Sequence, residues 1–429
     1  MPVRIDLNGL LAAVAGTDGL EPADLEGLAP ELVRVREQQR SGTIAGVTLP
    51  SRDDVRQTTA LAAELRDRFT TVVVLGARGA APATTALAAA FPAGAPRLVV
   101  ADSTDPETVE GWLAGLDLSR TLVDVVSPSG DPTTMAQFLI IRDRLLRELG
   151  AVDYRDHVIV TTDAEHGPLR QIVNDEGFRD FALPAGTTAP PGALTAAGLL
   201  PAAIAGVDIE ELLAGAAAIA ERAADTESPL ADPALLLGGA LWLMATRRQK
   251  RLAVLPGCSR LRPAIDRLRA LWVEHTGQTI DVAGPLPLRP GELGDAAVLF
   301  LSVESHAASV DVPACYQDLN DVSYLGGHSL GAVVAATQRA TEIMLARHRR
   351  PSATITLPAV NASTMGQLLY LIETVPLIAA ALGDRPPAAA EGEEEMRRLE
   401  SGLLGRPGFD AERGEAEAWV ARKDPRFVL

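Results

Sequence analysis

Two loops in the first third of the chain contain the residue types that bind anions through the main chain. The first, residues 75–79, follows a short apolar run, and the second, residues 127–134, combines serines, threonines and a glycine before a helix-like stretch. Backbone N–H groups at the start of a helix attract phosphate. The residues predicted to bind such an anion are Gly76, Arg78, Gly79, Ser127, Ser129, Gly130, Thr133 and Thr134. A plain strand-to-helix turn for the first loop and an ordinary N-cap turn for the second are the alternatives.

Acidic and basic side chains that could transfer protons are few and scattered. Glu274 lies in a helix-like stretch, where an isolated glutamate is usually a solvated surface residue. Its neighbour His275 points about 100° away around the helix, so the two would not act on one face. His328 follows two glycines, where it either approaches a crevice or bonds to backbone or water. The six histidines and two cysteines show no metal-ligand spacing, so neither a metal nor a cofactor is expected.

Short apolar, β-branched runs alternate with helix-like segments, and this pattern must position the loops. Runs at residues 71–75, 97–101, 121–126 and 157–161 predict strands buried on both faces, which is typical of a parallel sheet covered by helices. Residues 133–149 have helical periodicity. A second set of strands is predicted at residues 252–255, 297–303 and 353–357. The fold class is therefore α/β, with two domains that each contain a mainly parallel sheet flanked by helices.

Length and charge limit the domain count and the partners. The 429 residues predict an N-terminal helical segment (1–45), two α/β domains (46–210 and 211–383) and an acidic, helical tail (384–429). A net charge of −17 disfavours nucleic acid and anionic lipid. The longest charge-free stretch, residues 181–207, contains four prolines and predicts no membrane helix. Cysteine usage and the lack of an export signal favour the cytoplasm.

Several ordered blocks are more specific than any single motif. They are residues 197–209 with 213–216, 271–277, 324–331, 354–358 through 366–370, and 403–408. In order and spacing they resemble the glucose-6-phosphate isomerase family, in its shorter bacterial form, over nearly the whole chain. The resemblance implies two sugar-isomerase (SIS)-type domains, a homodimer with the active site at the domain junction, and a sugar phosphate of glycolysis and gluconeogenesis as substrate.

The resemblance also assigns roles to two residues. Glu274 falls where the family has the carboxylate base that moves a proton between C1 and C2 of an enediol intermediate. The family's C-terminal lysine aligns with Arg397, which keeps the positive charge but cannot donate a proton near neutral pH. The ring-opening histidine of the family is expected within residues 291–297, and that segment contains none.

The second loop departs from the family pattern in a way that opposes phosphate. Pro128 replaces a lysine, while Asp131 and Pro132 replace two threonines. Two prolines remove two backbone donors, and each unit of like charge costs roughly 4 kcal/mol at about 4 Å and an effective dielectric of about 20. Pro190 stands where the family has an arginine, and Arg78 is the one added cation that could compensate.

Two functions from different classes follow. The first is a divergent aldose–ketose isomerase that interconverts glucose 6-phosphate and fructose 6-phosphate with weakened activity, using Glu274 as base and Arg397 and Arg78 as positive charges. The second is a catalytically silent isomerase-fold protein, a pseudoenzyme that acts as a scaffold or partner subunit in sugar-phosphate metabolism. Loss of the histidine and of several phosphate contacts motivates the second hypothesis.

Overall fold

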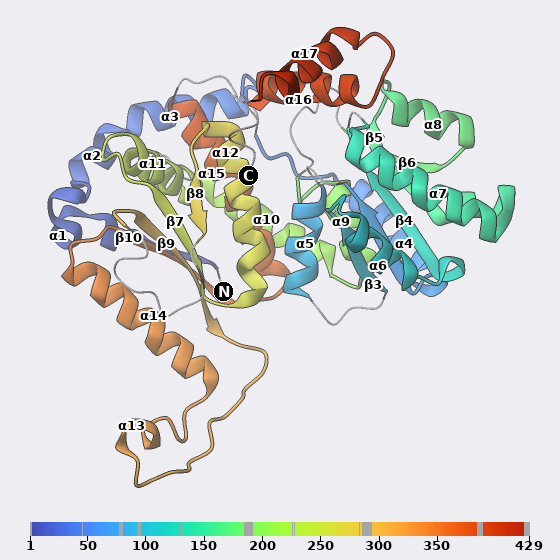
Figure 1. Ribbon diagram of the computed structural model, residues 1–429. Coiled ribbons are helices and arrows are strands. Elements are labelled where there is room, and N and C mark those ends of the chain that lie inside the picture. Colours follow the sequence, from blue (N-terminus) through green and yellow to red (C-terminus); the bar gives the residue numbers. More distant parts are fainter. Residues whose placement is uncertain are drawn as a thin grey trace.

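Two five-stranded sheets, each flanked by helices, occupy separate halves of the molecule (Figure 1). The computed structural model describes residues 2–44, 46–76, 80–91, 96–128, 130–183, 192–224, 226, 228–282, 284, 294–383 and 389–423 of the chain. The predicted α/β class with mainly parallel sheets is confirmed. The proposed limits of the four segments stay a prediction.

The first sheet is wholly parallel, with the strand order β3-β2-β4-β5-β6. Its strands are β2 (Thr71–Leu75), β3 (Arg97–Ala101), β4 (Thr121–Val126), β5 (Val158–Asp163) and β6 (Arg179–Leu183). The four strands predicted from apolar runs are confirmed. The apolar pattern does not predict β6, because β6 is an edge strand whose first residues are exposed and charged.

Helices cover both faces of this sheet and divide its apolar side chains between two cores. One face carries α6 (Pro106–Ala114), α7 (Pro132–Asp153) and α8 (Pro168–Glu176), which enclose a separate core. The other face carries α4 (Arg52–Arg68), α5 (Ala80–Ala90) and α9 (Ala196–Ile204). The core on that second face continues into the other half of the molecule, so the two halves share one apolar interior.

The second sheet has the order β1-β10-β9-β7-β8. Its strands are β1 (Arg4–Asp6), β7 (Leu252–Pro256), β8 (Ile280–Val282), β9 (Ala297–Ser305) and β10 (Ser352–Ala359). All neighbours are parallel except β1, which pairs antiparallel with β10 and places Ile5 opposite Ile355. The first 45 residues therefore contribute a strand as well as the helices α1 (Ala12–Ala15), α2 (Pro22–Gly27) and α3 (Ala29–Arg40).

One long apolar helix, α15 (Ala362–Leu382), passes through the shared core. It is long and apolar enough to cross a membrane, but 78% of the relevant window is buried inside the protein. It packs against α10 (Ile209–Ala224), α11 (Pro233–Thr246) and α12 (Arg262–Thr276). It is therefore the central helix of this fold.

Two glycines allow α10 and α15 to approach closely. A Cβ atom at Gly366 would lie 1.7 Å from the Leu212 carbonyl oxygen, and one at Gly215 would lie 2.0 Å from the Ser363 carbonyl oxygen. Both distances are far below van der Waals contact. Any side chain at either position would push the two helices apart.

Two segments extend from the body. Residues 306–329, which we call the arm, follow β9, contain α13 (Asn320–Ser323) and lead into α14 (Leu330–Arg347); Figure 1 shows them projecting away from both sheets. The last helices, α16 (Ala389–Leu403) and α17 (Asp410–Ala421), pack on each other, joined by an ion pair between Arg398 and Glu412.

A buried carboxyl group lies in the middle of the first sheet. Asp124 on β4 has no exposed surface, and neither carboxyl oxygen has a hydrogen-bond partner in the described part of the chain. On its strand it shares a face with Leu122 and Val126, which belong to the shared core. Burial penalises the charged form and raises the pKa of Asp124 to about 8, so this carboxyl is largely protonated at neutral pH.

Replacement of Asp124 by asparagine should change the pH dependence of stability. Between the ordinary pKa of 3.8 and the folded pKa of about 8, the native state keeps a proton that the unfolded state has released. Stability therefore falls as pH rises through this window, by up to about 1.4 kcal/mol per pH unit. Asp124→Asn should remove that slope and exceed the wild type in stability at pH 8. Urea unfolding at pH 5 and pH 8 measures the difference; the same pH response in both proteins would contradict the assignment.

Candidate functional site

The two loops predicted to bind phosphate lie at the same edge of the first sheet. Gly76 follows β2 and Ser127 follows β4, and these strands are parallel neighbours with Leu75 opposite Val125. The Ser127 N–H donates to the Thr161 carbonyl of β5 at 3.0 Å. Ligands of open parallel sheets bind at this carboxyl edge, so the structure brings the two loops together where a site is expected.

The carboxylate of Asp131 pairs with the N-terminus of α7. It accepts the Thr134 N–H at 2.9 Å through Oδ1 and the Ser127 hydroxyl at 2.9 Å through Oδ2. The Ser127 Oγ in turn accepts the N–H groups of Gly130 at 3.0 Å and of Asp131 at 3.2 Å. Three donors that the sequence predicts for a substrate phosphate are thus paired within the turn, namely the Ser127 hydroxyl and the N–H groups of Gly130 and Thr134. Asp131 is the N-cap of α7, a role that the order Asp-Pro-Thr-Thr could have indicated.

The structure describes some of the other loop residues that the sequence predicts to bind phosphate, and the rest lie outside the described residues. The Gly76 carbonyl accepts the Ala81 N–H at 2.9 Å, which starts α5 directly after the first loop. Thr133 is half-buried, whereas Thr134 is fully buried and its Oγ1 has no partner in the described ranges. Three predicted residues lie outside the described residues, namely Arg78, Gly79 and Ser129.

Glu274 lies in the last turn of α12 and is half-buried. α12 packs against α5, and the Arg260 guanidinium donates to the Ala90 carbonyl at 3.4 Å (Figure 1). This contact joins the start of α12 to the end of α5, so the two helices run in opposite directions. The turn with Glu274 therefore lies toward the end of α5 that follows Gly76.

A buried ion pair fixes α12 against α15. Arg267 is 1% exposed, Glu373 is 8% exposed, and their Nη2 and Oε1 atoms are 3.5 Å apart. The same Oε1 also accepts the Ala193 N–H from the turn before α9. Gly192 lies against Glu373 so closely that a Cβ there would come within 2.5 Å of Oε2. Removal of either charged partner would break a buried ion pair, at a cost of about 3–5 kcal/mol.

His275, the neighbour of Glu274, is neutral at physiological pH. Burial of the imidazole, together with the positive charge of Arg267, lowers the pKa of His275 to about 4. The ring therefore adds no positive charge beside Glu274 near pH 7.

Arg397 is engaged by a carboxylate of its own helix. Its Nε and Nη2 atoms donate to the two oxygens of Glu394, at 2.7 Å and 2.5 Å. Hydrogen bonding to Glu394 raises the pKa of Arg397 above its ordinary value, so the group is a fixed positive charge. A substrate that used Arg397 would have to compete with Glu394 for this bidentate contact.

The remaining histidines have structural surroundings. His157 is buried, its Nδ1 lies 2.9 Å from the Thr121 carbonyl oxygen, and its ring packs edge-on against Phe69. His328 is exposed on the arm, where its carbonyl accepts the Val312 N–H. Within the described ranges, no group of three or more His, Cys, Asp or Glu residues could hold a metal ion.

Comparison with known proteins was made for both sequence and fold. No family model matches the chain. The glucose-6-phosphate isomerase of Carboxydothermus hydrogenoformans is 30% identical over 100% of both chains, and that of Rubrobacter xylanophilus is 34% identical over 74% of this chain and 76% of its own. A hypothetical protein of Thermus thermophilus matches in structure with a TM-score of 0.74 and 26% identity, covering 93% of this chain and 100% of its own. A glucose-6-phosphate isomerase of Chlamydia trachomatis matches with a TM-score of 0.73 and 17% identity, covering 93% and 89%.

These likenesses and the two sheets define the class as a two-domain sugar-isomerase-type α/β protein. The identity extends over the whole chain. The chain belongs to the glucose-6-phosphate isomerase family, as its ordered sequence blocks predict.

Substitution of Asp131 should test the capping network at α7. Asp131→Ala leaves the Thr134 N–H and the Ser127 hydroxyl without their acceptor, so we expect a loss of about 1–2 kcal/mol of unfolding free energy. Asp131→Asn keeps an acceptor oxygen at the N-cap and should lose less than half of that. Urea denaturation at pH 7 measures both values. Equal losses in the two variants would show that the side-chain oxygen does not cap the helix.

Proposed function

We propose that the chain interconverts glucose 6-phosphate and fructose 6-phosphate, at a weakened rate, in cytoplasmic glycolysis and gluconeogenesis. The observation that carries the proposal is the 30% identity, over the full length of both chains, to a protein named glucose-6-phosphate isomerase. The position of Glu274 on α12, toward the start of α5, gives further support.

Glu274 is proposed as the base of the isomerisation. In the open-chain aldose, a carboxylate takes the proton from C2 and leaves a 1,2-enediolate; transfer of the O2 hydroxyl proton to O1 and return of the abstracted proton to C1 give the ketose. The same side chain can do both because C1 and C2 are adjacent. Anchoring of α12 by Arg267 and Glu373 supports this role, because a base contributes most when it is held in one position.

Three features of the chain support a weakened rate. Asp131 pairs with the donors that would bind the substrate phosphate, and its charge opposes a dianion. Arg397 is paired with Glu394 and supplies charge without a transferable proton. Residues 291–297 contain no histidine to open the sugar ring.

A catalytically silent scaffold or partner subunit is the second candidate function. The observation that favours it is the internal pairing of Ser127, Asp131 and Thr134, which satisfies the α7 N-terminus without a ligand. Under this alternative the fold is kept for a contact with another protein of sugar-phosphate metabolism.

Replacement of Glu274 by glutamine separates the two candidates. If Glu274 is the base, Glu274→Gln should lower kcat by about 10²–10⁴-fold with little change in KM, because the amide cannot accept the proton. A coupled assay on purified protein measures the rate in both directions. Asp266→Asn is the matched control, since Asp266 lies two turns earlier on α12 and pairs with Arg262 at 3.4 Å. Absence of turnover in folded wild-type protein would instead favour the scaffold.

We propose that the arm holds two copies of the chain together as a homodimer. Its backbone is ordered by hydrogen bonds such as Val312 N–H to the His328 carbonyl at 2.8 Å. Its apolar side chains nevertheless face solvent, with exposed fractions of 56% for Val310, 70% for Tyr316, 54% for Leu319 and 66% for Tyr324. Several large apolar side chains exposed on one projecting segment are typical of a protein interface. A symmetric exchange of arms would bury it on both chains.

Charge placed on the arm should dissociate the homodimer. Wild-type protein should sediment with twice the 45.0 kDa mass of one chain, and a Tyr316→Asp/Leu319→Asp variant should sediment as a monomer. Val152→Asp serves as the control, because Val152 is 78% exposed at the far end of α7. A monomeric wild type, or a variant that still sediments as a dimer, would refute the role of the arm.

A further inference from the structure

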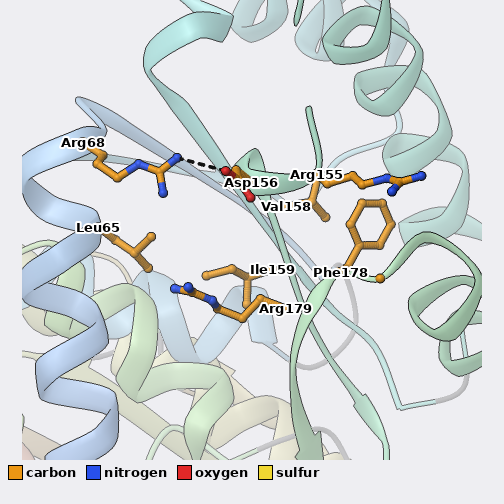
Figure 2. A pocket seen from close by; sticks show the side chains of 9 residues that line it. Leu65, Arg68, Arg155, Asp156, Val158, Ile159, Phe178 and Arg179 are labelled. Carbon is orange, nitrogen blue, oxygen red and sulfur yellow. Dashed lines mark ion pairs between the residues drawn. The ribbon is translucent and has the colours of Figure 1, made fainter. Parts of the chain in front are cut away.

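A cavity of about 320 Å³ opens at the amino edge of the first sheet, where β5 and β6 begin. Its wall is apolar in part, and Leu65 and Ile159 lie beside the Arg179 side chain in Figure 2. This volume is at the lower end of small-molecule sites. The loops at Gly76 and Ser127 lie at the opposite, carboxyl edge of the sheet, so the cavity is separate from the candidate catalytic site.

Positive charge gathers at this cavity in a chain of strongly negative net charge. Three arginines line it, Arg68 at the end of α4, Arg155 in the 3₁₀ turn before β5, and Arg179 at the start of β6. Asp156 is the one acidic residue among the lining residues, so the lining charge is three minus one, or two positive units. The whole chain carries −17. Two further carboxylates offset this charge from just outside the lining: Glu64 lies within 4.0 Å of Arg68 and Arg179, and Glu176 lies 3.8 Å from Arg155.

Arg68 and Arg179 converge on one point. Both Nη1 atoms lie near Oε1 of Glu64, at 4.0 Å for Arg68 and 3.6 Å for Arg179, and Arg68 lies 3.8 Å from Asp156. Figure 2 shows the two guanidinium groups directed toward the same opening, whereas Arg155 points away from it. These three ion pairs are longer than hydrogen bonds, and no hydrogen bond described in the structure uses either guanidinium. Long, exposed ion pairs of this kind contribute little to stability, so another anion can replace the carboxylate at low cost.

We propose that this cavity binds a phosphomonoester, with the phosphate bridging Arg68 and Arg179 and the organic group lying over Leu65 and Ile159. With Glu64 turned away, Arg68 and Arg179 outnumber Asp156 by one positive unit, and the tetrahedral oxygens of a phosphate can each meet a planar guanidinium fork at hydrogen-bond distance. Glu64 occupies the position between the two arginines. Its side chain is 52% exposed, so it can turn into solvent when the phosphate enters.

Titration calorimetry with phenyl phosphate tests the site on the full-length protein. Phenyl phosphate should bind in a saturable manner, and inorganic phosphate should bind more weakly because it lacks the apolar group. Arg68→Gln and Arg179→Gln should each raise Kd by about tenfold, because each removes one charged contact to the phosphate. Glu64→Gln should lower Kd, because it removes the carboxylate that competes for the same two arginines. A purely structural role for these residues would not reverse the sign of the effect in this way.

Arg147→Gln is the matched control for lost charge. Arg147 is 77% exposed on α7, pairs with Asp143 at 2.8 Å and does not line the cavity, so its loss should leave Kd unchanged. Absence of phenyl phosphate binding to the wild type would overturn the proposal. An unchanged Kd in Arg68→Gln and Arg179→Gln, or an equal rise in Arg147→Gln, would overturn it as well. Turnover of glucose 6-phosphate is a separate measurement, so failure here leaves the proposed isomerase function intact.

Discussion

The packing of α15 in the shared core is the constraint on which the rest of the molecule depends. Gly366 lets α10 approach to backbone contact, and Glu373 holds both Arg267 of α12 and the main chain before α9. Helices from both halves of the chain are thereby fixed to one element. Because Glu274 lies in the last turn of α12, the position of the proposed base follows from contacts about two helical turns away. Rigidity at the site is thus a property of the core rather than of the loops.

Much of the fold could be predicted from the sequence because the central strands are short, continuous apolar runs, as at residues 72–75 and 298–301. The edge strands β1, β6 and β8 are short and partly charged, and their pairing is decided by tertiary contacts. At the candidate site, the residue types near Ser127 predicted an anion-binding turn. Their actual partner, the Asp131 carboxylate, depends on side-chain geometry that sequence alone does not fix.

The two edges of the first sheet differ in how tightly carboxylates of the chain occupy the groups that could bind an anion. At the carboxyl edge a carboxylate of the chain already pairs with the helix donors, through hydrogen bonds of 2.9 Å. At the amino edge the guanidinium groups are held only by contacts of 3.6–4.0 Å. The pairs at the carboxyl edge are short and partly buried, so an incoming anion meets more competition there. Compared with the family pattern, the turn has therefore lost cations, and it has also gained a carboxylate that competes with an incoming anion for the donors of the turn.

The pairing of β1 with β10 has a consequence for how the chain is made. Asp6 lies beside Thr354, so the ribosome must add 348 residues after the first strand before its partner exists. At about 5–20 residues per second this takes roughly 17–70 s. The strands of the first sheet all lie between Thr71 and Leu183, so this sheet can fold during that time. Val3 and Ile5 then have no β10 to pack or pair with. The second sheet is therefore completed late in synthesis.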